Sequence, residues 1–303
     1  MKLLITGAWN FTSEQLNQIN SIGHTVVFMQ NEKDELPCKY EEIEGVICNG
    51  LFLYHNIEKF SSLKYIQLTS AGFDRVPMDY VQSHDIKIFN ARGVYSIPMA
   101  EFAISGVLQL YKQSKFFYKI QKNRVWEKHR NLLELYGKTV CIVGCGNVGT
   151  ECAKRFKAFG CNVVGVDLYP RQDDAYEKIY SLNDLDNCLE NADAVVLTLP
   201  LTNETKHIMN ANRFKVMKNG SVLVNIARGQ VIDEQALLKA LDDKLLGAVL
   251  DVFEEEPLCA KSPLWQKENA IITPHNSFVG DGNNGRLFNV ILENLSKVGI
   301  VND

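Results

Sequence analysis

The chain has 303 residues, 46% of them apolar, and a formal net charge of −4 at pH 7. A chain of this length is expected to form two compact cores rather than one. The small negative charge, without a run of about five like charges, argues against nucleic acid as a partner, and no run of about eighteen apolar residues predicts a membrane span.

The N-terminus, MKLLITGAWNF, has no apolar segment followed by a small-residue cleavage site. We therefore expect a soluble, cytoplasmic protein. The eight cysteines contain no C-x-x-C pair, so no metal site is expected. Most of them lie in apolar segments, where free cysteine behaves as a small hydrophobic residue in a reducing compartment.

Short β-branched segments alternate with helix-length pieces from the first residue onward. The first series of five predicted strands covers residues 2–6, 25–29, 44–49, 64–70 and 86–90. This alternation is typical of a parallel α/β sheet.

A predicted helix follows, starting near Pro98, and links the first series to the second. Phe116, Phe117, Tyr118 and Trp126 are expected on its far side. This much aromatic surface predicts a homodimer through the helical region 98–130, although packing within the chain is the alternative.

The second series of predicted strands covers residues 139–144, 162–167, 193–200, 221–227, 246–252 and 270–275, with a helix at 233–244. A glycine-rich crossover and a final amphipathic helix come last, and we expect that helix to return to the first unit. The predicted fold is therefore α/β, with two doubly wound, Rossmann-like or flavodoxin-like parallel-sheet domains and an active-site cleft between them. The first domain is expected to contain residues 1–97 plus 281–303, and the second residues 98–280.

The segment TVCIVGCGNVGTECAKRFKAFG predicts a dinucleotide site. A strand runs into Gly144, Gly146 and Gly149, and the third glycine opens a helix. The first glycine permits the turn, the second lets backbone approach a pyrophosphate, and the third allows helix and strand to pack closely. The next predicted strand ends in Asp167, whose carboxylate suits a ribose diol and repels a 2′-phosphate, so NAD is the expected cofactor.

Three consecutive predicted strands are each followed by a polar group: an arginine, a cluster of acidic residues and a histidine. Arg228 lies just after the strand in LVNIARG, acidic residues follow the strand in LDVFEEEP, and His275 follows the strand in IITPH. Ligands of open α/β sheets bind beyond the carboxyl ends of the strands, so these groups are expected to converge. Glu254 and Glu255 are expected to be solvated, and the remaining histidines to lie on the surface: His24, His55, His84, His129 and His207.

Motifs in this order resemble the D-isomer-specific 2-hydroxyacid dehydrogenase family: GCGNVG, NIARGQVIDEQAL, GAVLDVFEEEPL, PLW and TPH. TSAGFDRV and NARGVYSIPMAE resemble that family's substrate loop and hinge. The resemblance implies that Arg228 binds substrate, that His275 is the general acid/base and that Glu256 is its partner. It also implies that backbone N–H groups of Ala71 and Gly72 hold the substrate carboxylate. Further residues expected at the cofactor are Asn147, Val148, Pro200, Ala227 and Asp251.

A carboxylate beside an imidazole favours the protonated form, which suits proton donation near neutral pH. The resemblance implies that hydride passes between a nicotinamide held by residues 98–280, the NAD-binding domain, and a small 2-keto or 2-hydroxy acid of the D series held by residues 1–97 plus 281–303, the substrate-binding domain. His275 would protonate the oxygen while Arg228 holds the carboxylate and the carbonyl by forked hydrogen bonds.

Several alternatives remain open. Arg171 could meet the 2′-phosphate of NADP, although a solvated loop arginine is the simpler interpretation. A regulatory protein that senses NAD without turnover would need the glycine loop but not the acid/base set. A glyoxylate or hydroxypyruvate reductase that prefers NADP, or a short phosphoglycerate dehydrogenase without a regulatory domain, also fits the resemblance. The sequence does not indicate which 2-hydroxy acid is used.

Overall fold

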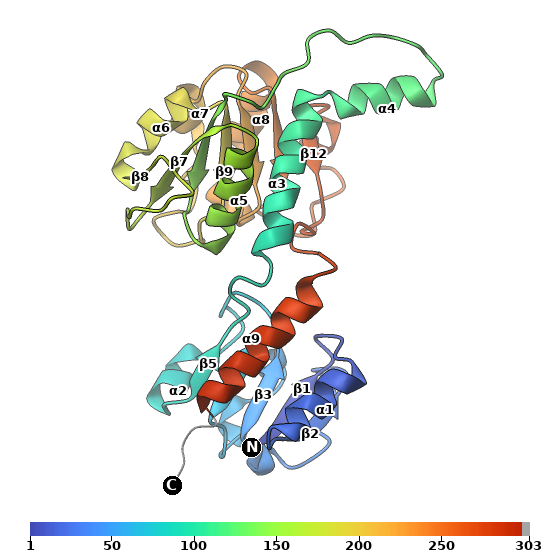
Figure 1. Ribbon diagram of the computed structural model, residues 1–303, viewed down its shortest axis with the longest axis vertical. Coiled ribbons are helices and arrows are strands. Elements are labelled where there is room, and N and C mark those ends of the chain that lie inside the picture. The colour runs from blue at the N-terminus through green and yellow to red at the C-terminus, as the bar shows by residue number, and fades with distance from the viewer. Residues whose placement is uncertain (299–303) are drawn as a thin grey trace. The chain divides into compact units, whose positions relative to one another are not determined.

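The computed structural model describes residues 1–298, which form two compact units. The first unit contains Met1–Tyr95 and the segment from Gly280 onward, and the second contains Ser96–Val279. Each unit is built on a parallel sheet covered by helices (Figure 1), so the predicted α/β class with two parallel sheets is confirmed. Of the helices within residues 1–298, none is both long and apolar enough to cross a membrane.

The sheet of the first unit has five parallel strands in the order β2-β1-β3-β4-β5. This is the flavodoxin-like strand order, with the topological switch between β1 and β3. The strands are β1 (Lys2–Thr6), β2 (Thr25–Met29), β3 (Gly45–Cys48), β4 (Tyr65–Leu68) and β5 (Lys87–Phe89).

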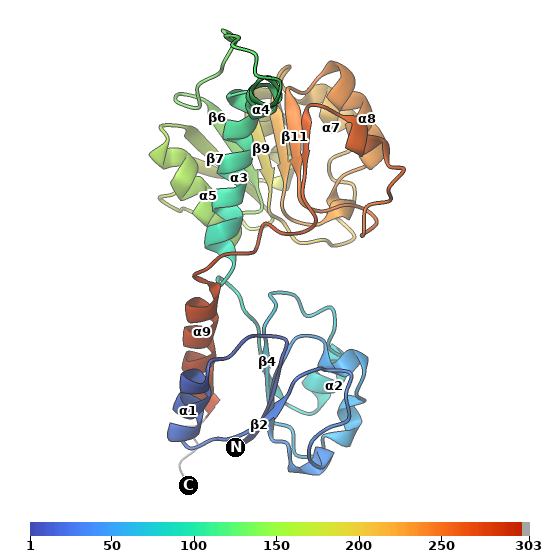
Figure 2. The same ribbon diagram turned by 90° about the vertical axis from the view of Figure 1, so that its right-hand side faces the viewer.

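Side chains of these strands alternate between two apolar layers, as the pleat requires. Leu3 and Ile5 of β1 pack with α1 (Ser13–Ser21) and α9 (Asn283–Val298), which lie on the same face of the sheet in Figure 2. Leu4 faces the opposite layer, which contains α2 (Met78–Ser83) and the short 3-10 helices η1 (Tyr40–Glu42), η2 (Leu51–Leu53) and η3 (Ile57–Lys59). The C-terminal helix α9 therefore completes the core of the first unit.

The sheet of the second unit has seven parallel strands in the order β12-β11-β10-β9-β6-β7-β8. This is the Rossmann order with one further strand, and its switch point lies between β6 and β9. The strands are β6 (Thr139–Val143), β7 (Asn162–Asp167), β8 (Lys178–Ser181), β9 (Ala194–Leu197), β10 (Val222–Asn225), β11 (Gly247–Leu250) and β12 (Ala270–Ile272).

The edge strand β8 is absent from the predicted series. Its four residues, KIYS, contain only one fully buried side chain, Ile179, and Lys178 is exposed. An edge strand buries little surface and shows neither a long apolar run nor clear alternation, so the usual pattern is missing.

Two helical layers cover the sheet of the second unit. The helices α3 (Ser96–Tyr111) and α5 (Asn147–Ala158) pack on one face. The other face carries α6 (Leu185–Asn191), α7 (Ala211–Val216) and α8 (Glu234–Asp243). The remaining 3-10 helices are η4 (Leu182–Asp184), η5 (Gly229–Val231) and η6 (Pro263–Gln266).

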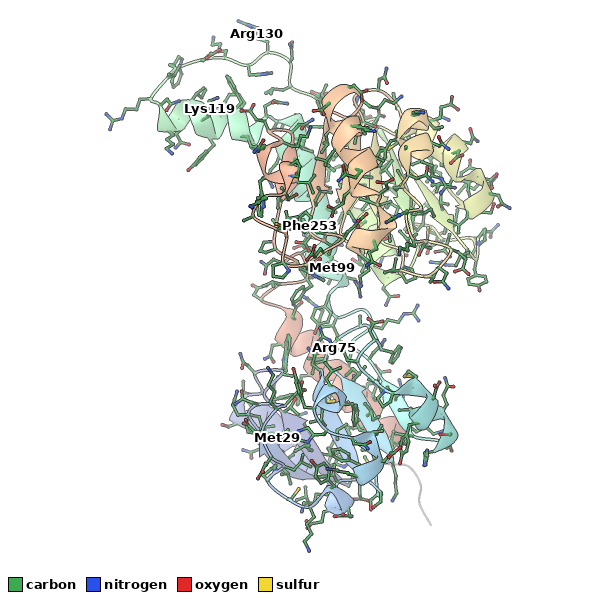
Figure 3. All side chains as sticks on the ribbon, turned by 180° about the vertical axis from the view of Figure 1, so that it is seen from behind. Met29, Arg75, Met99, Lys119, Arg130 and Phe253 are labelled. Atoms are coloured by element: carbon green, nitrogen blue, oxygen red, sulfur yellow. The ribbon has the colours of Figure 1, made fainter. Side chains whose placement is uncertain are left out.

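A helix is present around Pro98 as predicted, namely α3, but the expectation that this one helix also carries Phe116, Phe117, Tyr118 and Trp126 is wrong. The chain turns at Gln113, which has a φ of +53° in the left-handed region, and a separate helix α4 (Ser114–Lys122) follows. Left-handed backbone cannot continue a right-handed helix. Trp126 lies in the irregular segment after α4, not on a helix face. Figure 3 shows Lys119 of α4 and Arg130 of this segment standing away from the sheet.

Candidate active site

Three adjacent strands carry the predicted catalytic residues to one edge of the second sheet. Asn225 at the end of β10 is paired with Leu250 of β11, which is in turn paired with Ile272 of β12. The three parallel strands therefore end at the same level, and Arg228, Glu256 and His275 follow them. This is the edge at which ligands of open α/β sheets bind.

His275 and Glu256 form a hydrogen-bonded pair. The Nδ1 atom of the imidazole lies 2.8 Å from Oε2 of Glu256, and the side chains are 45% and 36% exposed. The other carboxylate oxygen, Oε1, accepts the N–H of Phe253 at 3.1 Å. With Nδ1 committed to the carboxylate, Nε2 is left for a ligand, and a carboxylate partner orients the ring in this way in acid/base sites.

Asp251 holds the segment that carries His275. Its buried carboxylate accepts the hydroxyl of Thr273 at 2.6 Å, the N–H of Asn276 at 2.8 Å and the N–H of Ser277 at 2.9 Å. His275 has a φ of +51°, a backbone conformation that is costly for residues other than glycine. The clamp by Asp251 maintains this conformation on both sides of the histidine.

Arg228 projects from a rigid loop after β10. Buried Asn225 accepts the N–H of Ala227 at 3.1 Å and donates to the carbonyl of Arg228 at 3.0 Å. The guanidinium is exposed and donates to the Ala227 carbonyl at 2.7 Å. Within residues 1–298, Arg228 forms no hydrogen bond or ion pair with Glu256 or His275. The fold thus brings the arginine to the same edge as the pair and leaves its fork available.

The glycine loop between β6 and α5 fits a dinucleotide. Gly144 has a φ of +99°, and a Cβ there would lie 2.5 Å from the N atom of Leu199 at the switch point. A Cβ on Gly149 would lie 2.1 Å from the carbonyl oxygen of Gly144, so helix and strand touch at that position. These contacts explain two of the three glycines by packing alone.

Gly146 has no such packing reason. A Cβ there would meet no atom within 4 Å, and its φ is −75°. It precedes the first turn of α5, which has no side-chain cap. Open space in front of uncapped helical N–H groups is what a pyrophosphate requires, and a side chain at Gly146 would fill that space. The residues present therefore fit NAD, with Asn147 and Val148 supplying the first N–H groups of the helix.

Asp167 lies beside this loop, at the end of β7. Its Oδ2 accepts the N–H of Cys145 at 2.7 Å, and its Oδ1 accepts the N–H of Tyr169 at 3.0 Å. A carboxylate has about four acceptor positions, so both oxygens can still accept ribose hydroxyls. Burial raises the pKa of Cys145 to about 12, in agreement with a packing role for this thiol.

Arg171 lies in a loop and its side chain is 46% exposed, as expected of a solvated loop arginine, but it also makes two polar contacts. It donates to the Cys145 carbonyl at 2.6 Å and pairs with Asp173 at 3.1 Å. Its guanidinium is therefore fixed against the glycine loop, because a backbone carbonyl there and a nearby carboxylate both attract it.

The surface assignment of His55 is wrong, since this side chain is 7% exposed. Its ring nitrogens lie 2.8 Å from the Tyr40 hydroxyl and 2.9 Å from the Glu32 carbonyl oxygen. A histidine with both nitrogens satisfied can be buried at little cost, which a polar local sequence does not reveal.

The other predicted residues are distributed over both units. Pro200 and Ala227 follow β9 and β10 at the carboxyl edge of the second sheet, and Pro200 is exposed while Ala227 is buried. Ala71 and Gly72 follow β4 in the first unit, where the carbonyl of Ala71 accepts the side-chain amide of Asn90 at 2.6 Å.

The residues that brace the site were not predicted from the sequence. A signal existed for Asn225, because it is a lone polar residue at the end of an apolar strand. Glu254 is exposed, as expected, and its Oε1 atom also lies 3.1 Å from Nε2 of His207 and 3.2 Å from the N atom of Glu234. No local pattern indicates these contacts, because the three residues come from separate segments.

Comparison with known proteins agrees with this geometry. Residues 104–277 match the sequence model described as the D-isomer specific 2-hydroxyacid dehydrogenase, NAD binding domain, which confirms the predicted NAD-binding role of this region. The chain is 31% identical over 98% of its length to D-3-phosphoglycerate dehydrogenase of Methanocaldococcus jannaschii, and 36% identical over 71% to glyoxylate reductase of Thermofilum pendens. The matched regions are 57% and 65% of those two proteins.

A solved structure shows the same fold. The D-isomer specific 2-hydroxyacid dehydrogenase family protein from Aeromonas salmonicida superposes with a TM-score of 0.82 at 31% identity, covering 98% of this chain and 94% of that one. Family model, relatives and fold agree with one another, and the chain belongs to the D-isomer specific 2-hydroxyacid dehydrogenase family.

Proposed function

We propose that this protein is an NAD-dependent oxidoreductase that interconverts a small 2-keto acid and the corresponding D-2-hydroxy acid. The observation that carries the proposal is the 2.8 Å contact between His275 and Glu256 at the carboxyl edge of the Rossmann sheet. An NAD-binding unit without catalytic function needs the glycine loop, but it does not need an acid/base pair held in a strained, clamped segment.

NAD would be held by the N–H groups at the start of α5, in front of Gly146, and by the carboxylate of Asp167. The cofactor, when bound, supplies or accepts the hydride. The carboxylate favours NAD because it would repel the 2′-phosphate of NADP. Arg171 does not reverse this preference in the proposal, since its guanidinium is already engaged with Asp173 and with a backbone carbonyl.

His275 would exchange the proton of the substrate. In reduction, the protonated imidazole donates from Nε2 to the oxygen of the carbonyl, and in oxidation the neutral ring accepts that proton. Glu256 keeps Nδ1 occupied, so the ring presents Nε2, and its negative charge stabilises the imidazolium. The donor is therefore oriented before substrate arrives.

Arg228 would bind the carboxylate and the carbonyl oxygen of the substrate through its planar fork, which aligns the reacting carbon. We further propose that the N–H groups of Ala71 and Gly72 in the first unit contribute to carboxylate binding, and that Asp251 lies near the nicotinamide carboxamide. The D stereochemistry and these last roles are supported by family membership.

A homodimer through the helical region 98–130 is part of the proposal. Trp126 is 97% exposed and Tyr118 is 68% exposed, which is unusual for side chains of this size. Sedimentation should show a dimer at micromolar concentration, and a double substitution of both aromatic residues by serine should shift the protein toward the monomer. A monomeric wild-type protein would contradict this part.

The test of function is the loss of absorbance of NADH, and separately NADPH, with a panel of 2-keto acids. The panel contains glyoxylate, hydroxypyruvate, pyruvate, phenylpyruvate, 2-ketoisocaproate and phosphohydroxypyruvate. Turnover with NADH that disappears in His275→Ala, but persists in the control His84→Ala at an exposed histidine, is the expected result. NADH binding without turnover across the panel would refute the proposal and favour an NAD sensor.

A further inference from the structure

The backbone of Phe253 and Glu254 connects the active-site segments of the second unit. The N–H of Phe253 donates to Oε1 of Glu256 at 3.1 Å, and the N–H of Glu254 donates to Oε1 of Glu234 at 2.8 Å. Two successive N–H groups are thus held by two carboxylates, one from the proposed catalytic pair and one from α8. Any shift of this backbone moves the anchor of Glu256.

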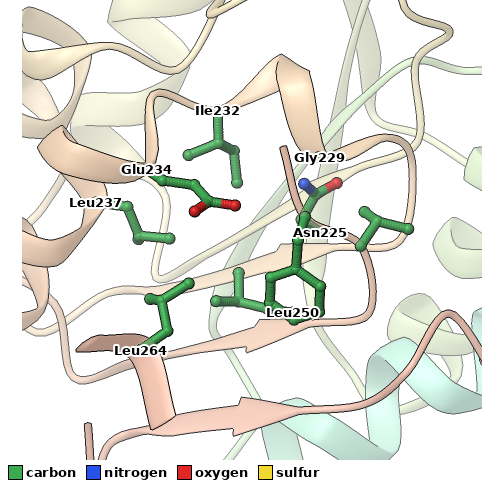
Figure 4. A pocket seen from close by; sticks show the side chains of 9 residues that line it. Asn225, Gly229, Ile232, Glu234, Leu237, Leu250 and Leu264 are labelled. Carbon is green, nitrogen blue, oxygen red and sulfur yellow. The ribbon is translucent and has the colours of Figure 1, made fainter. Parts of the chain in front are cut away.

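The contact between Glu254 and Glu234 is reciprocal. The first N–H group of α8, that of Glu234, has no partner within its own helix, and it donates to Oε1 of Glu254 at 3.2 Å. The same oxygen lies 3.1 Å from Nε2 of His207. In Figure 4 the carboxylate of Glu234 points into the small pocket that Asn225 and Gly229 also line.

The loop of Arg228 rests on the same backbone. A Cβ on Gly229 would lie 1.8 Å from both the carbonyl carbon and the carbonyl oxygen of Phe253. Gly229 therefore packs against the peptide group between Phe253 and Glu254, and the N–H of that peptide group donates to Glu234. One short stretch of backbone thereby sets the positions of Arg228 and Glu256.

Burial of the Glu234 carboxylate at this position is unfavourable for its charged form. Burial raises its pKa; the N–H of Glu254 opposes that effect, and the charge of the Glu254 carboxylate adds to it. A half-buried acid beside a second acid is unfavourable unless its hydrogen bonds are needed. No described residue other than Glu254 receives a hydrogen bond from, or donates one to, the Glu234 side chain in residues 1–298.

We propose that Glu234 is a positioning residue, which fixes the Phe253–Glu254 backbone and through it the placement of Glu256 against His275. The inference rests on the proposed function, because it assigns a role toward the acid/base pair. Glu234 itself does not contact the pair: it acts through the peptide N–H of Glu254.

The experiment measures the pH titration of the His275 imidazole by NMR in the full-length protein, so that it does not depend on turnover. The variants are Glu234→Met, which removes the acceptor at similar size, and Glu234→Gln, which keeps an acceptor oxygen. Glu255→Met is the matched control, since Glu255 is exposed and makes no hydrogen bond or ion pair with residues 1–298. Glu256→Gln gives the effect of losing the partner carboxylate.

Glu234→Met should move the titration midpoint of His275 to lower pH, in the same direction as Glu256→Gln, while Glu234→Gln moves it less and Glu255→Met leaves it unchanged. The double variant Glu234→Met/Glu256→Gln should titrate like Glu256→Gln alone, because both changes act on the contact between Glu256 and His275. Where NADH-dependent turnover is measured, Glu234→Met should lower kcat on the order of tenfold with little change in KM.

A Glu234→Met protein that is folded and titrates like wild type, while Glu256→Gln is shifted, would overturn the positioning role and leave the proposed function intact. A Glu256→Gln protein that titrates like wild type would show that the carboxylate does not act on His275. That result would remove the pair from the proposed function and overturn the inference with it.

Discussion

The Gly146→Ala variant tests whether this glycine is required for binding a ligand or for packing within the protein. The added Cβ would meet no protein atom within 4 Å, and a φ of −75° is accessible to alanine. Alanine lowers the entropy of the unfolded chain, which stabilises by about 0.4–1 kcal/mol, but it is a poorer helix N-cap than glycine by a similar amount. Thermal unfolding should therefore be nearly unchanged.

NADH binding should weaken strongly in the same variant. The methyl group occupies the space in front of the first turn of α5, so a pyrophosphate would have to withdraw from the helical N–H groups. Loss of one hydrogen bond to a charged group costs about 1.5–3 kcal/mol, which corresponds to a roughly ten- to hundredfold increase in Kd. Isothermal titration calorimetry with NADH measures this directly.

Two further glycines serve as controls. Gly149→Ala places a Cβ 2.1 Å from a backbone oxygen, so it should destabilise the second unit by about 1–3 kcal/mol. Gly285→Ala lies in α9 with nothing within 4 Å of its Cβ, and it should leave both stability and NADH affinity close to wild type or slightly improve stability. A Gly146→Ala protein that binds NADH with wild-type affinity would refute the placement of the cofactor at α5.

Three other predictions concern charge, recognition and packing. Arg228→Lys should lower kcat/KM about ten- to hundredfold in steady-state assays, because lysine cannot make the forked contact. Gly229→Ala should lower the thermal unfolding midpoint by several degrees, corresponding to about 1–3 kcal/mol, since its Cβ would overlap the Phe253 carbonyl. The N–H of Lys2 holds the pKa of Glu44 below its usual range, so this carboxylate stabilises the fold above about pH 4.3 and loses that effect as the pH falls through its lowered value. Glu44→Gln should therefore unfold at lower temperature than wild type at pH 7, and the difference should shrink in acid; a constant difference would contradict it.

The arrangement of the sheets was predictable because buried parallel strands have a strong signal. The four residues of β9 and the four of β10 are all buried; β9 is apolar throughout, and β10 is apolar up to its last residue, Asn225. The edge strand β8 has no such run, and the turn at Gln113 has neither glycine nor proline to mark it. The prediction failed where burial or turn chemistry is weak, because sequence patterns report burial more directly than backbone direction.

In the proposed site, too, the sequence indicates some features and not others. Arg228 and His275 could be proposed because each follows a strand, and parallel strands deliver such residues to one edge whatever the rest of the chain does. The strand ends indicated only a group of acids between them, and the family resemblance singled out Glu256. Their orientation could not be identified in this way. It depends on contacts between segments far apart in sequence, such as the contact of Glu234 with the N–H of Glu254.

The difference between Gly146 and Gly229 shows why contacts are needed to read a motif. Both glycines lie in recognisable motifs, and the sequence alone gives them equal weight. In the structure, Gly229 is closed against the Phe253 peptide, whereas Gly146 faces open space at a helix N-terminus. The protein itself therefore excludes a side chain from the first, whereas in the proposal the bound cofactor excludes one from the second. The same distinction separates the residues proposed to bind NAD or substrate from those, such as Glu234, proposed to hold the binding residues in place.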